Sequence, residues 1–476
     1  MILTSFIFFL LVFVAIGVLS IFSAKKTSKD YLLAGQNTKP WLAALSAIAT
    51  NNSGYMFVGQ IGFTYAFGLH SIWLGIGWIA GDFLTSLFVH KRLRQQSEKN
   101  KSFSFAGTLA QWQGTDFKYV RVIGGLITLA FLGTYAAAQL NAGSKALHVL
   151  FDWDYSIGAI IGAIIVLTYC FAGGIRASIW TDAAQSFVMI FAMALLLIIA
   201  VMEIGGLSAF GSGLYDVSDI YMNLFPTDQP GGAYLGPLLF VAGWFFAGVG
   251  VIGQPHIMVR FMAMDDADQM RRARVYYYGW YILFYAMTIA VALAARLLLP
   301  DTNGFDAELA LPTLAGQLLP EIFVGLILAA LFAATTSTAD SQILSCTSSI
   351  TQDLLPSRFS GYLANKISTL LVTAIALAIA LLGSESVFSL VIIAWSALGS
   401  AFAPLLILFA LRQPVRESVA ILMMTGGLAT TILWRFAGLN EYMYEIAPGI
   451  LAGFFIYLLA KLFRLNTITP SSVTES

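Results

Sequence analysis

The sequence predicts an all-α protein that crosses a membrane about thirteen times. Three observations lead to this fold class: an apolar composition, an uneven distribution of positive charge, and two helix interruptions at corresponding places. Of the 476 residues, 58% are hydrophobic and 11% are charged, and the mean hydropathy is +0.81. Soluble proteins are about one quarter charged. A chain this apolar cannot cover its surface with polar groups, so lipid must be its main solvent.

Apolar runs long enough to cross a bilayer recur along nearly the whole chain. Their lengths fit helices, because the strands of an outer-membrane barrel would show alternation over about ten residues. We expect one membrane domain at 1–465 and a polar cytoplasmic tail at 466–476. The predicted spans are 2–23, 41–65, 69–91, 120–149, 156–172, 179–204, 236–262, 276–299, 311–348, 366–383, 388–411, 416–436 and 442–463.

The positive charges support this count. If the N-terminus lies outside, 22 of the 25 Lys and Arg residues fall in cytoplasmic segments, and only Lys145, Arg296 and Arg435 do not. Cytoplasmic loops of membrane proteins carry such an excess. Arg260, which closes the span 236–262, is counted with the cytoplasmic charges. We therefore expect a multi-pass protein of a bacterial-type inner membrane, with its C-terminus in the cytoplasm. A net charge of zero predicts no nucleic-acid partner.

Two predicted spans are interrupted by poor helix formers. The span 41–65 contains Thr50–Gly54, and the span 236–262 contains Gly248, Gly250, Gly253 and Pro255. Such residues also form close packing faces between helices, which is the simpler reading of either break alone. The breaks lie five spans apart, so helices 2–6 and 7–11 would form two inverted repeats, with helices 1, 12 and 13 peripheral. Paired breaks in inverted repeats are typical of secondary transporters with a binding site at mid-membrane.

The span 311–348 is rich in hydroxyl groups at its centre. Sodium prefers oxygen ligands, and the hydroxyls of Ser337 and Thr338 could meet carbonyls freed near Ala49 and Asn52. The alternative is that each hydroxyl bonds back to the preceding turn of its own helix. The sequence thus predicts a weak, uncharged sodium site between the spans 41–65 and 311–348, with both readings open.

Inserting a carboxylate into a membrane costs about 2.5–3.5 kcal/mol on insertion scales. A carboxylate found there is therefore interpreted first as part of a functional site. Asp340 lies in the middle of the span 311–348 and is expected to face a cavity with a cation or proton. Asp182 lies in the first turn of the predicted span 179–204, where an acid also stabilises a helix N-terminus. Capping and cation binding therefore both remain open for Asp182. Asp82 and Glu203 receive no role.

These motifs resemble the sodium/solute symporter family, and most closely its sodium/proline symporter branch. The resemblance runs nearly end to end. Its strongest block closes the span 236–262 with Gly253–Ile257 and Arg260–Ala263. The other blocks are Asp30–Gly35, Ala44–Ala47, Ser53–Gly54, Trp180–Asp182 with Gln185, Ser337–Thr338 with Gln342, Ile350–Thr351 with Asp353, and Trp395–Pro404.

The resemblance implies a leucine-transporter-type core of five plus five inverted helices, alternating access, and uptake driven by one or two sodium ions. It implies a first sodium site formed by the carbonyls of Ala49, Asn52 and Ala334 and the hydroxyls of Ser337 and Thr338. A second sodium site, present in some relatives, matches Ser337 with Asp182, Asp340 and Ser341. The proline branch has an acidic residue where this chain has Asn51. This departure from the branch argues against proline as the substrate.

Substrate contacts are expected near the breaks, and the candidates are Tyr55, Gln60, Tyr135, Gln139, Trp244 and Phe245. The alternative for each is simple packing or an interfacial aromatic belt. The sequence places no Arg or Lys at mid-membrane in these helices, which favours a neutral or zwitterionic solute such as an amino acid. A sugar or carboxylate symporter, a passive channel and a sensor are the alternatives. An enzyme is not expected, because His70, His90, His148 and His256 are scattered. We expect a functional monomer in the lipid bilayer.

Overall fold

The structure, a computed structural model, describes residues 1–476 except 228, 300–303, 384–386 and 467–476. Within this part of the chain every regular element is a helix, so the all-α prediction is confirmed. The predicted tail at 466–476 lies outside the described residues apart from Asn466. The first half comprises α1 (Ile2–Leu19), α2 (Ser28–Leu33), α3 (Pro40–Phe57), α4 (Gly59–Phe67), α5 (Ile72–Ser86), α6 (Val89–Lys99), α7 (Phe105–Ala110), α8 (Lys118–Phe151), α9 (Tyr155–Gly173) and α10 (Ile175–Ile204). The second half comprises α11 (Leu207–Tyr215), α12 (Gly232–Val249), η4 (Gly250–Gly253), α13 (Pro255–Met262), α14 (Met270–Leu298), α15 (Ala310–Leu318), α16 (Glu321–Ser348), α17 (Tyr362–Leu382), α18 (Val387–Ala410), α19 (Glu417–Phe436) and α20 (Ile446–Leu462).

Ten of the described helices are long and apolar enough to cross a membrane, or eleven if the bent pair Leu69–Ser86 and Val89–Lys99 is one span. Two further predicted spans are helical but fall outside that count. The segment 41–65 is divided between α3 and α4, and α20 has only 17 residues. The number thirteen therefore stays a prediction, although every predicted segment contains helix.

The predicted span 311–348 is wrong as a single helix. It is divided into the short α15 and the long α16 by an extended Leu319, whose φ and ψ are −98° and 145°. The cause is Pro320, because a proline disfavours helical geometry in the residue before it. The proline then stands directly before α16 as its N-cap, where a missing backbone N–H costs nothing.

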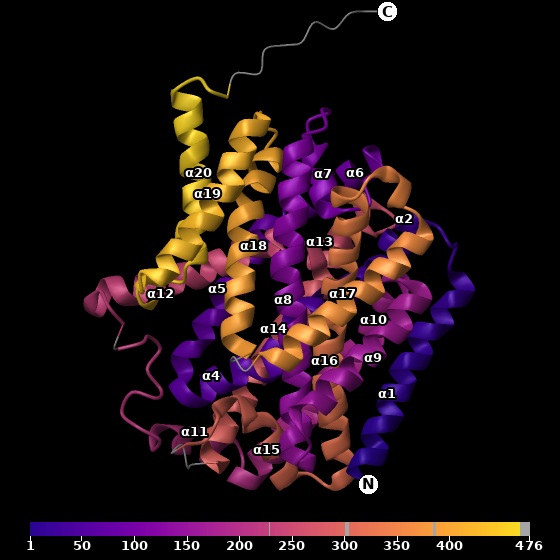
Figure 1. The fold of residues 1–476 in the computed structure, drawn as a ribbon. Helices are drawn as coiled ribbons and strands as arrows, with labels where there is room; N and C mark the ends of the chain where they lie inside the picture. Colours follow the sequence, from indigo (N-terminus) through magenta and orange to yellow (C-terminus); the bar gives the residue numbers. More distant parts are fainter. Residues whose placement is uncertain (228, 300–303, 384–386, 467–476) are drawn as a thin grey trace, which may run out of the picture.

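The helix α16 forms the centre of the bundle. In its apolar window 89% of the residues are buried, against 22% for α1. It packs against α3, α8 and α10. Figure 1 shows α1 along one side of the molecule and α19 and α20 along the other. The polar stretch of α16 is thus placed where three other helices can supply partners.

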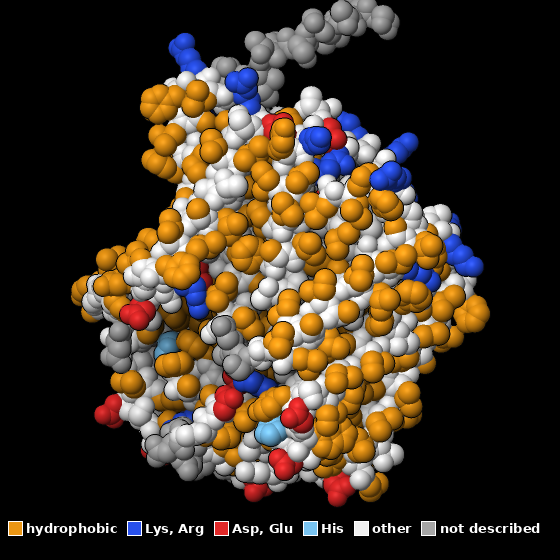
Figure 2. All heavy atoms as spheres, in the orientation of Figure 1, with side chains coloured by type: hydrophobic (Ala, Val, Ile, Leu, Met, Phe, Trp, Pro, Cys, Tyr) orange, Lys and Arg blue, Asp and Glu red, His pale blue; other side chains and the backbone are white. Residues whose placement is uncertain are grey.

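The surface supports a membrane location. Figure 2 shows hydrophobic side chains over the middle of the molecule, Lys and Arg gathered toward one end, and Asp and Glu toward the other. The start of α1 and the end of α20 also lie at opposite ends of the bundle (Figure 1). This arrangement is what an odd number of spans and a biased distribution of positive charge would produce.

Candidate functional site

The first helix break is centred on Ser53 in α3, whose φ and ψ are 50° and −178°. The neighbouring helix α8 satisfies the backbone there, because Gly54 donates its N–H to Oε1 of Gln139 at 2.8 Å. Tyr55 donates its N–H to Oγ of Ser53 at 3.0 Å, and the Tyr135 hydroxyl donates to the same oxygen at 3.4 Å. A freed backbone inside a membrane needs such partners. Two predicted substrate residues, Tyr135 and Gln139, therefore lie directly against the break.

The second break lies between α12 and α13, where the tight turn η4 is followed by an extended Gln254. It rests on α18, since a Cβ on Gly253 would come within 2.9 Å of the Gly399 Cα atom. Gln254 donates to the carbonyl of Trp395 at 3.0 Å, and the Trp395 ring donates to the carbonyl of Ala247 at 3.1 Å. Both interruptions expected from the sequence are thus present as breaks.

The hydroxyls predicted for the first sodium site reach α3 and also bond back within α16. Ser337 donates to the Ala334 carbonyl at 3.1 Å and approaches the Ala49 carbonyl at 3.5 Å. Thr338 donates to the carbonyls of Ala334 and Thr50, both at 3.0 Å. Four of the five predicted ligands are therefore gathered in one place.

Asn52 is predicted to supply the fifth ligand through its backbone carbonyl. Its side-chain amide donates to the Ile48 carbonyl at 2.9 Å, within its own helix. Its Oδ1 atom is buried and has no hydrogen-bond partner among the described residues. The structure brings Thr50, rather than Asn52, into hydrogen-bond contact with α16.

The predicted second site contains a cation of the chain itself. Asp182 and Asp340 are fully buried, and Nη2 of Arg260 lies 3.5 Å from Oδ2 of Asp182 and 3.4 Å from Oδ1 of Asp340. The guanidinium also contacts Ser341, and Ser178 donates to Oδ1 of Asp340 at 2.7 Å. Counted as ions, two carboxylates and one guanidinium give the cluster a formal charge of minus one. The other carboxylate oxygens, Oδ1 of Asp182 and Oδ2 of Asp340, have no hydrogen-bond partner in the described part of the chain.

Two sequence predictions about this cluster are wrong, namely the start of the helix that carries Asp182 and the place of Arg260 among the loop charges. The helix α10 begins at Ile175, so Asp182 lies well inside it and does not cap its N-terminus. The helix starts early because Gly174, with a φ of 58°, makes the turn that a side chain would strain. Arg260 is not a cytoplasmic loop charge, since its side chain is fully buried between Asp182 and Asp340.

The remaining substrate candidates, Tyr55, Gln60, Trp244 and Phe245, differ in the contacts that they make. Gln60 is buried and bonded, because its Oε1 accepts from the hydroxyls of Tyr55 at 3.2 Å and Tyr285 at 2.8 Å. Trp244 stacks on Trp78 with ring centroids 6.1 Å apart. The backbone of Phe245 packs closely against α5. A Cβ atom added to Gly77 or Gly81 of that helix would clash with it. Gln60 is thus held by hydrogen bonds within the bundle and Phe245 by backbone packing, whereas Tyr55 and Trp244 belong to an aromatic layer.

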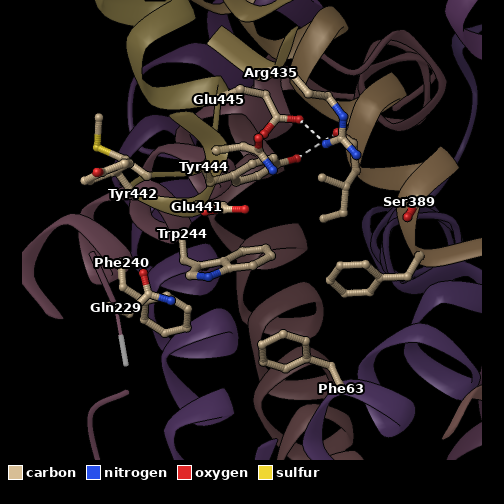
Figure 3. A pocket seen from close by; sticks show the side chains of 14 residues that line it. Phe63, Gln229, Phe240, Trp244, Ser389, Arg435, Glu441, Tyr442, Tyr444 and Glu445 are labelled. Atoms are coloured by element: carbon tan, nitrogen blue, oxygen red, sulfur yellow. Dashed lines mark hydrogen bonds and ion pairs between the residues drawn. The ribbon is translucent and has the colours of Figure 1, made fainter. Parts of the chain in front are cut away.

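Part of this aromatic layer lines a pocket. The rings of Phe63, Phe388 and Tyr55 stack in sequence, with centroids 5.7 Å and 5.5 Å apart. The pocket has a volume of about 250 Å³, and Phe63, Phe388 and Trp244 are among the residues that line it. Figure 3 shows Phe63 and Trp244 in its wall, with the ion pair between Arg435 and Glu445, 2.8 Å long, across its other side.

His256 is a site residue that the sequence analysis missed. It opens α13 directly after the second break, and its ring lies edge-on to Tyr135 with centroids 5.6 Å apart. Both of its ring nitrogens are buried without a hydrogen-bond partner among the described residues, as is Nε2 of Gln139. Its place immediately after Pro255 in the broken span was the available signal. These atoms, with Oδ1 of Asn52, are neutral groups that a polar solute could satisfy.

Comparison with known proteins gives a consistent result. The sequence profile of the Sodium:solute symporter family matches residues 31–427. The high-affinity proline transporter PutP of Bacillus subtilis is 31% identical over 92% of this chain and 95% of its own. The sodium/proline symporter of Escherichia coli is 31% identical over 90% of this chain and 86% of its own.

Solved structures share the fold. A substrate-bound, outward-open Na⁺-coupled sialic acid symporter superimposes with a TM-score of 0.84 at 18% identity, covering 99% of this chain and 98% of its own. MhsT in complex with L-phenylalanine gives 0.57 at 14% identity, covering 88% and 98%. These likenesses confirm the leucine-transporter-type fold class. The chain belongs to the sodium:solute symporter family, and it is a multi-pass membrane transporter that couples solute movement to sodium.

Proposed function

We propose that this chain imports proline, or another small zwitterionic amino acid, together with sodium by alternating access. The observation that carries the proposal is the set of buried neutral groups beside the two breaks, on Asn52, Gln139 and His256, that have no hydrogen-bond partner among the described residues. Neutral donors and acceptors suit a solute without net charge. The proline transporters of comparable length support the same substrate class.

A sugar acid is the second candidate, because the sialic acid symporter has the same fold over nearly the whole chain. An anionic solute would need a cation near the breaks. Arg260 is the buried cation closest in sequence to the second break, and it already faces Asp182 and Asp340. Pairing with two carboxylates leaves it a poor partner for a third anion. The amino acid therefore remains the favoured solute.

The first sodium ion is proposed to bind between α3 and α16. The carbonyls of Ala49, Asn52 and Ala334 and the hydroxyls of Ser337 and Thr338 would be its ligands. Support comes from Ser337, whose hydroxyl already bridges the Ala334 and Ala49 carbonyls. An ion entering there would replace weak hydrogen bonds by contacts with oxygen ligands, which hard cations prefer.

A second sodium ion is proposed at Asp182, Asp340 and Ser341. Its support is the net negative charge that Arg260 leaves uncompensated, together with the free oxygen on each carboxylate. Asp182→Asn or Asp340→Asn should reduce the number of coupled ions or their affinity, while sodium still binds at Ser337 and Thr338. Unchanged sodium dependence of uptake in both variants would exclude this second site.

The proposed architecture places α3–α10 and α12–α18 in the two inverted repeats, with α1, α19 and α20 peripheral. The N-terminus is proposed to lie outside and the C-terminus in the cytoplasm, on the basis of the charge asymmetry in Figure 2. The functional unit is proposed to be a monomer, because both breaks and all proposed ligands come from one chain.

The function is tested by thermal unfolding of the purified protein with amino acids, sugars and carboxylates, each with and without sodium. A ligand at about one hundred times its Kd stabilises the folded state by about 2.7 kcal/mol. Proline or a related amino acid should stabilise the protein in sodium buffer and do so far less in potassium. Stabilisation that is indifferent to sodium would contradict coupled symport, and stabilisation by sialic acid alone would favour the second candidate.

A further inference from the structure

Asp82 is a buried carboxylate that none of the proposed ion or solute sites uses. It lies on α5, and its side chain is completely inaccessible to solvent. Neither Oδ1 nor Oδ2 has a hydrogen-bond partner among the described residues. Its backbone is pressed against α12, since a Cβ on Gly248 would lie 2.9 Å from the Asp82 nitrogen. A carboxylate in such a place must be neutralised.

The groups around Asp82 are phenols. The side chains of Tyr277 and Tyr278 on α14 interact with the carboxyl group, although no hydrogen bond of good geometry joins them in this state. Tyr281, one turn further along α14, also interacts with it electrostatically. From α12 the neighbour is the backbone of Gly248. Within the described part of the chain no Lys, Arg or His forms an ion pair with Asp82.

One of these phenols connects Asp82 with the first helix break. The Tyr277 hydroxyl accepts a hydrogen bond from Nδ2 of Asn51 at 2.6 Å. Asn51 lies two residues before Ser53, where α3 leaves helical geometry, and its own Oδ1 has no partner among the described residues. A change at the carboxyl group can therefore reach the break through two side chains, Tyr277 and Asn51.

We propose that Asp82 is a proton-binding site, and that Tyr277 and Asn51 couple its protonation to the broken part of α3. The carboxylate takes a proton from a hydronium ion of the solvent, which becomes water. The resulting neutral acid can donate to the oxygen of Tyr277 or Tyr278. A proton fits better than sodium, because a metal ion would need several further oxygens and the carboxylate faces only phenols. The coupling to sodium rests on the proposed function, whereas the proton site does not.

The proton site is tested by infrared difference spectroscopy of the full-length protein between acidic and alkaline buffer, without sodium. The wild type should show a carbonyl band of a protonated carboxyl that disappears as the pH rises. Asp82→Asn should lose that component. Glu203→Gln, a change of an exposed acid on α10, should retain it. Identical titrating bands in the wild type and Asp82→Asn would overturn the proposal.

A second variant keeps the test decisive if Asp82→Asn does not fold. Tyr278→Phe removes a hydroxyl beside the carboxyl group and should shift the frequency of its band, and an unshifted band would overturn the assignment. Sodium is then added at constant pH. It should change the Asp82 band in the wild type but not in Tyr277→Phe, and a band indifferent to sodium in both would overturn the coupling. Failure of sodium to stabilise the wild type against heat would instead identify a failure of the proposed function.

Discussion

A hydroxyl group on a helix can bond to its own helix and still be available to an ion. Ser337 and Thr338 are in this position, because each donates to the Ala334 carbonyl and also contacts a carbonyl of α3. Ser337→Ala and Thr338→Val should each weaken sodium binding by about 10- to 100-fold. The basis is that a hydrogen bond to a charged group is worth about 1.5–3 kcal/mol, and 1.4 kcal/mol is a factor of ten. The measurement is the sodium concentration for half-maximal thermal stabilisation.

The matched control is Ser348→Ala on the same helix. The Ser348 hydroxyl donates to the Ser345 carbonyl at 2.9 Å, near the end of α16, and the proposed sodium site does not include it. Its removal should leave sodium affinity unchanged. Equal affinity in Ser337→Ala, Thr338→Val and this control would contradict the ligand assignment.

The charge balance around Arg260 leads to an unequal pair of mutational effects. Arg260→Gln leaves two buried carboxylates without their cation and should destabilise the protein by about 3–5 kcal/mol. Asp340→Asn leaves one carboxylate with one guanidinium, a neutral cluster, and should cost clearly less. Thermal unfolding in sodium-free buffer measures both changes. A larger loss in Asp340→Asn than in Arg260→Gln would contradict the net negative charge of the cluster.

For single residues, the sequence predicted the kind of site, an oxygen-rich cation site, better than it predicted which residues form it. The hydroxyl pair Ser337 and Thr338 and the acid Asp340 were identifiable because polar residues are conspicuous in an apolar helix. Arg260 and His256 were not, because each follows a break at which a helix end and a loop look alike. A charge beyond such a break is equally compatible with a cytoplasmic loop, and only the packing of α13 against α3 and α16 decides between them.

At the scale of the element, the break in α3 depends on close contact with two neighbouring helices. A Cβ on Gly54 would come within 2.6 Å of the Thr335 side chain and 3.0 Å of the Ala142 Cβ atom. Gly54→Ala should therefore destabilise the protein by about 1–3 kcal/mol through overpacking. It should also abolish stabilisation by sodium, because the Ala49 and Thr50 carbonyls would shift away from α16.

Gly133→Ala on α8 is the matched control for this change. A Cβ there would meet no atom within 4 Å, so stability and the sodium response should both be retained. Thermal unfolding of the two variants with and without sodium provides the comparison. If Gly54→Ala behaves like Gly133→Ala, the close contact at the break has no role in sodium binding.

Element boundaries were predictable where the local sequence alone determines them. The two breaks follow from runs of poor helix formers, and both are present. The division of the segment 311–348 into two helices is not visible in the hydropathy pattern, because apolar residues continue across it. The local sign of the division is Pro320. The early start of α10 depends on Gly174, whose positive φ lets the chain reverse closely against Tyr31. Such tertiary contact is not visible in a hydropathy pattern.

At the scale of the whole molecule, the separation of basic from acidic side chains predicts how the protein is oriented in the membrane. Figure 2 shows the basic end and the acidic end separated by an apolar middle. The N-terminal amine pairs with Glu321 at 2.8 Å, so the chain start and the beginning of α16 lie at the same end. Because basic residues stay on the cytoplasmic side, this end should be external.

Thiol labelling on intact cells tests that orientation. The native Cys170 and Cys346 are buried, so an impermeant maleimide should leave the wild type unmodified. Asp219→Cys, at an exposed position following α11, should be labelled from outside. Arg358→Cys, at an exposed position following α16, should be labelled only after the membrane is permeabilised. The reversed pattern would contradict the orientation, and labelling of both from outside would mean an odd number of spans does not separate them. Six predicted spans precede Asp219, and only five would precede it if the broken segment of α3 and α4 did not cross the membrane. The result therefore also tests whether that segment crosses as one span.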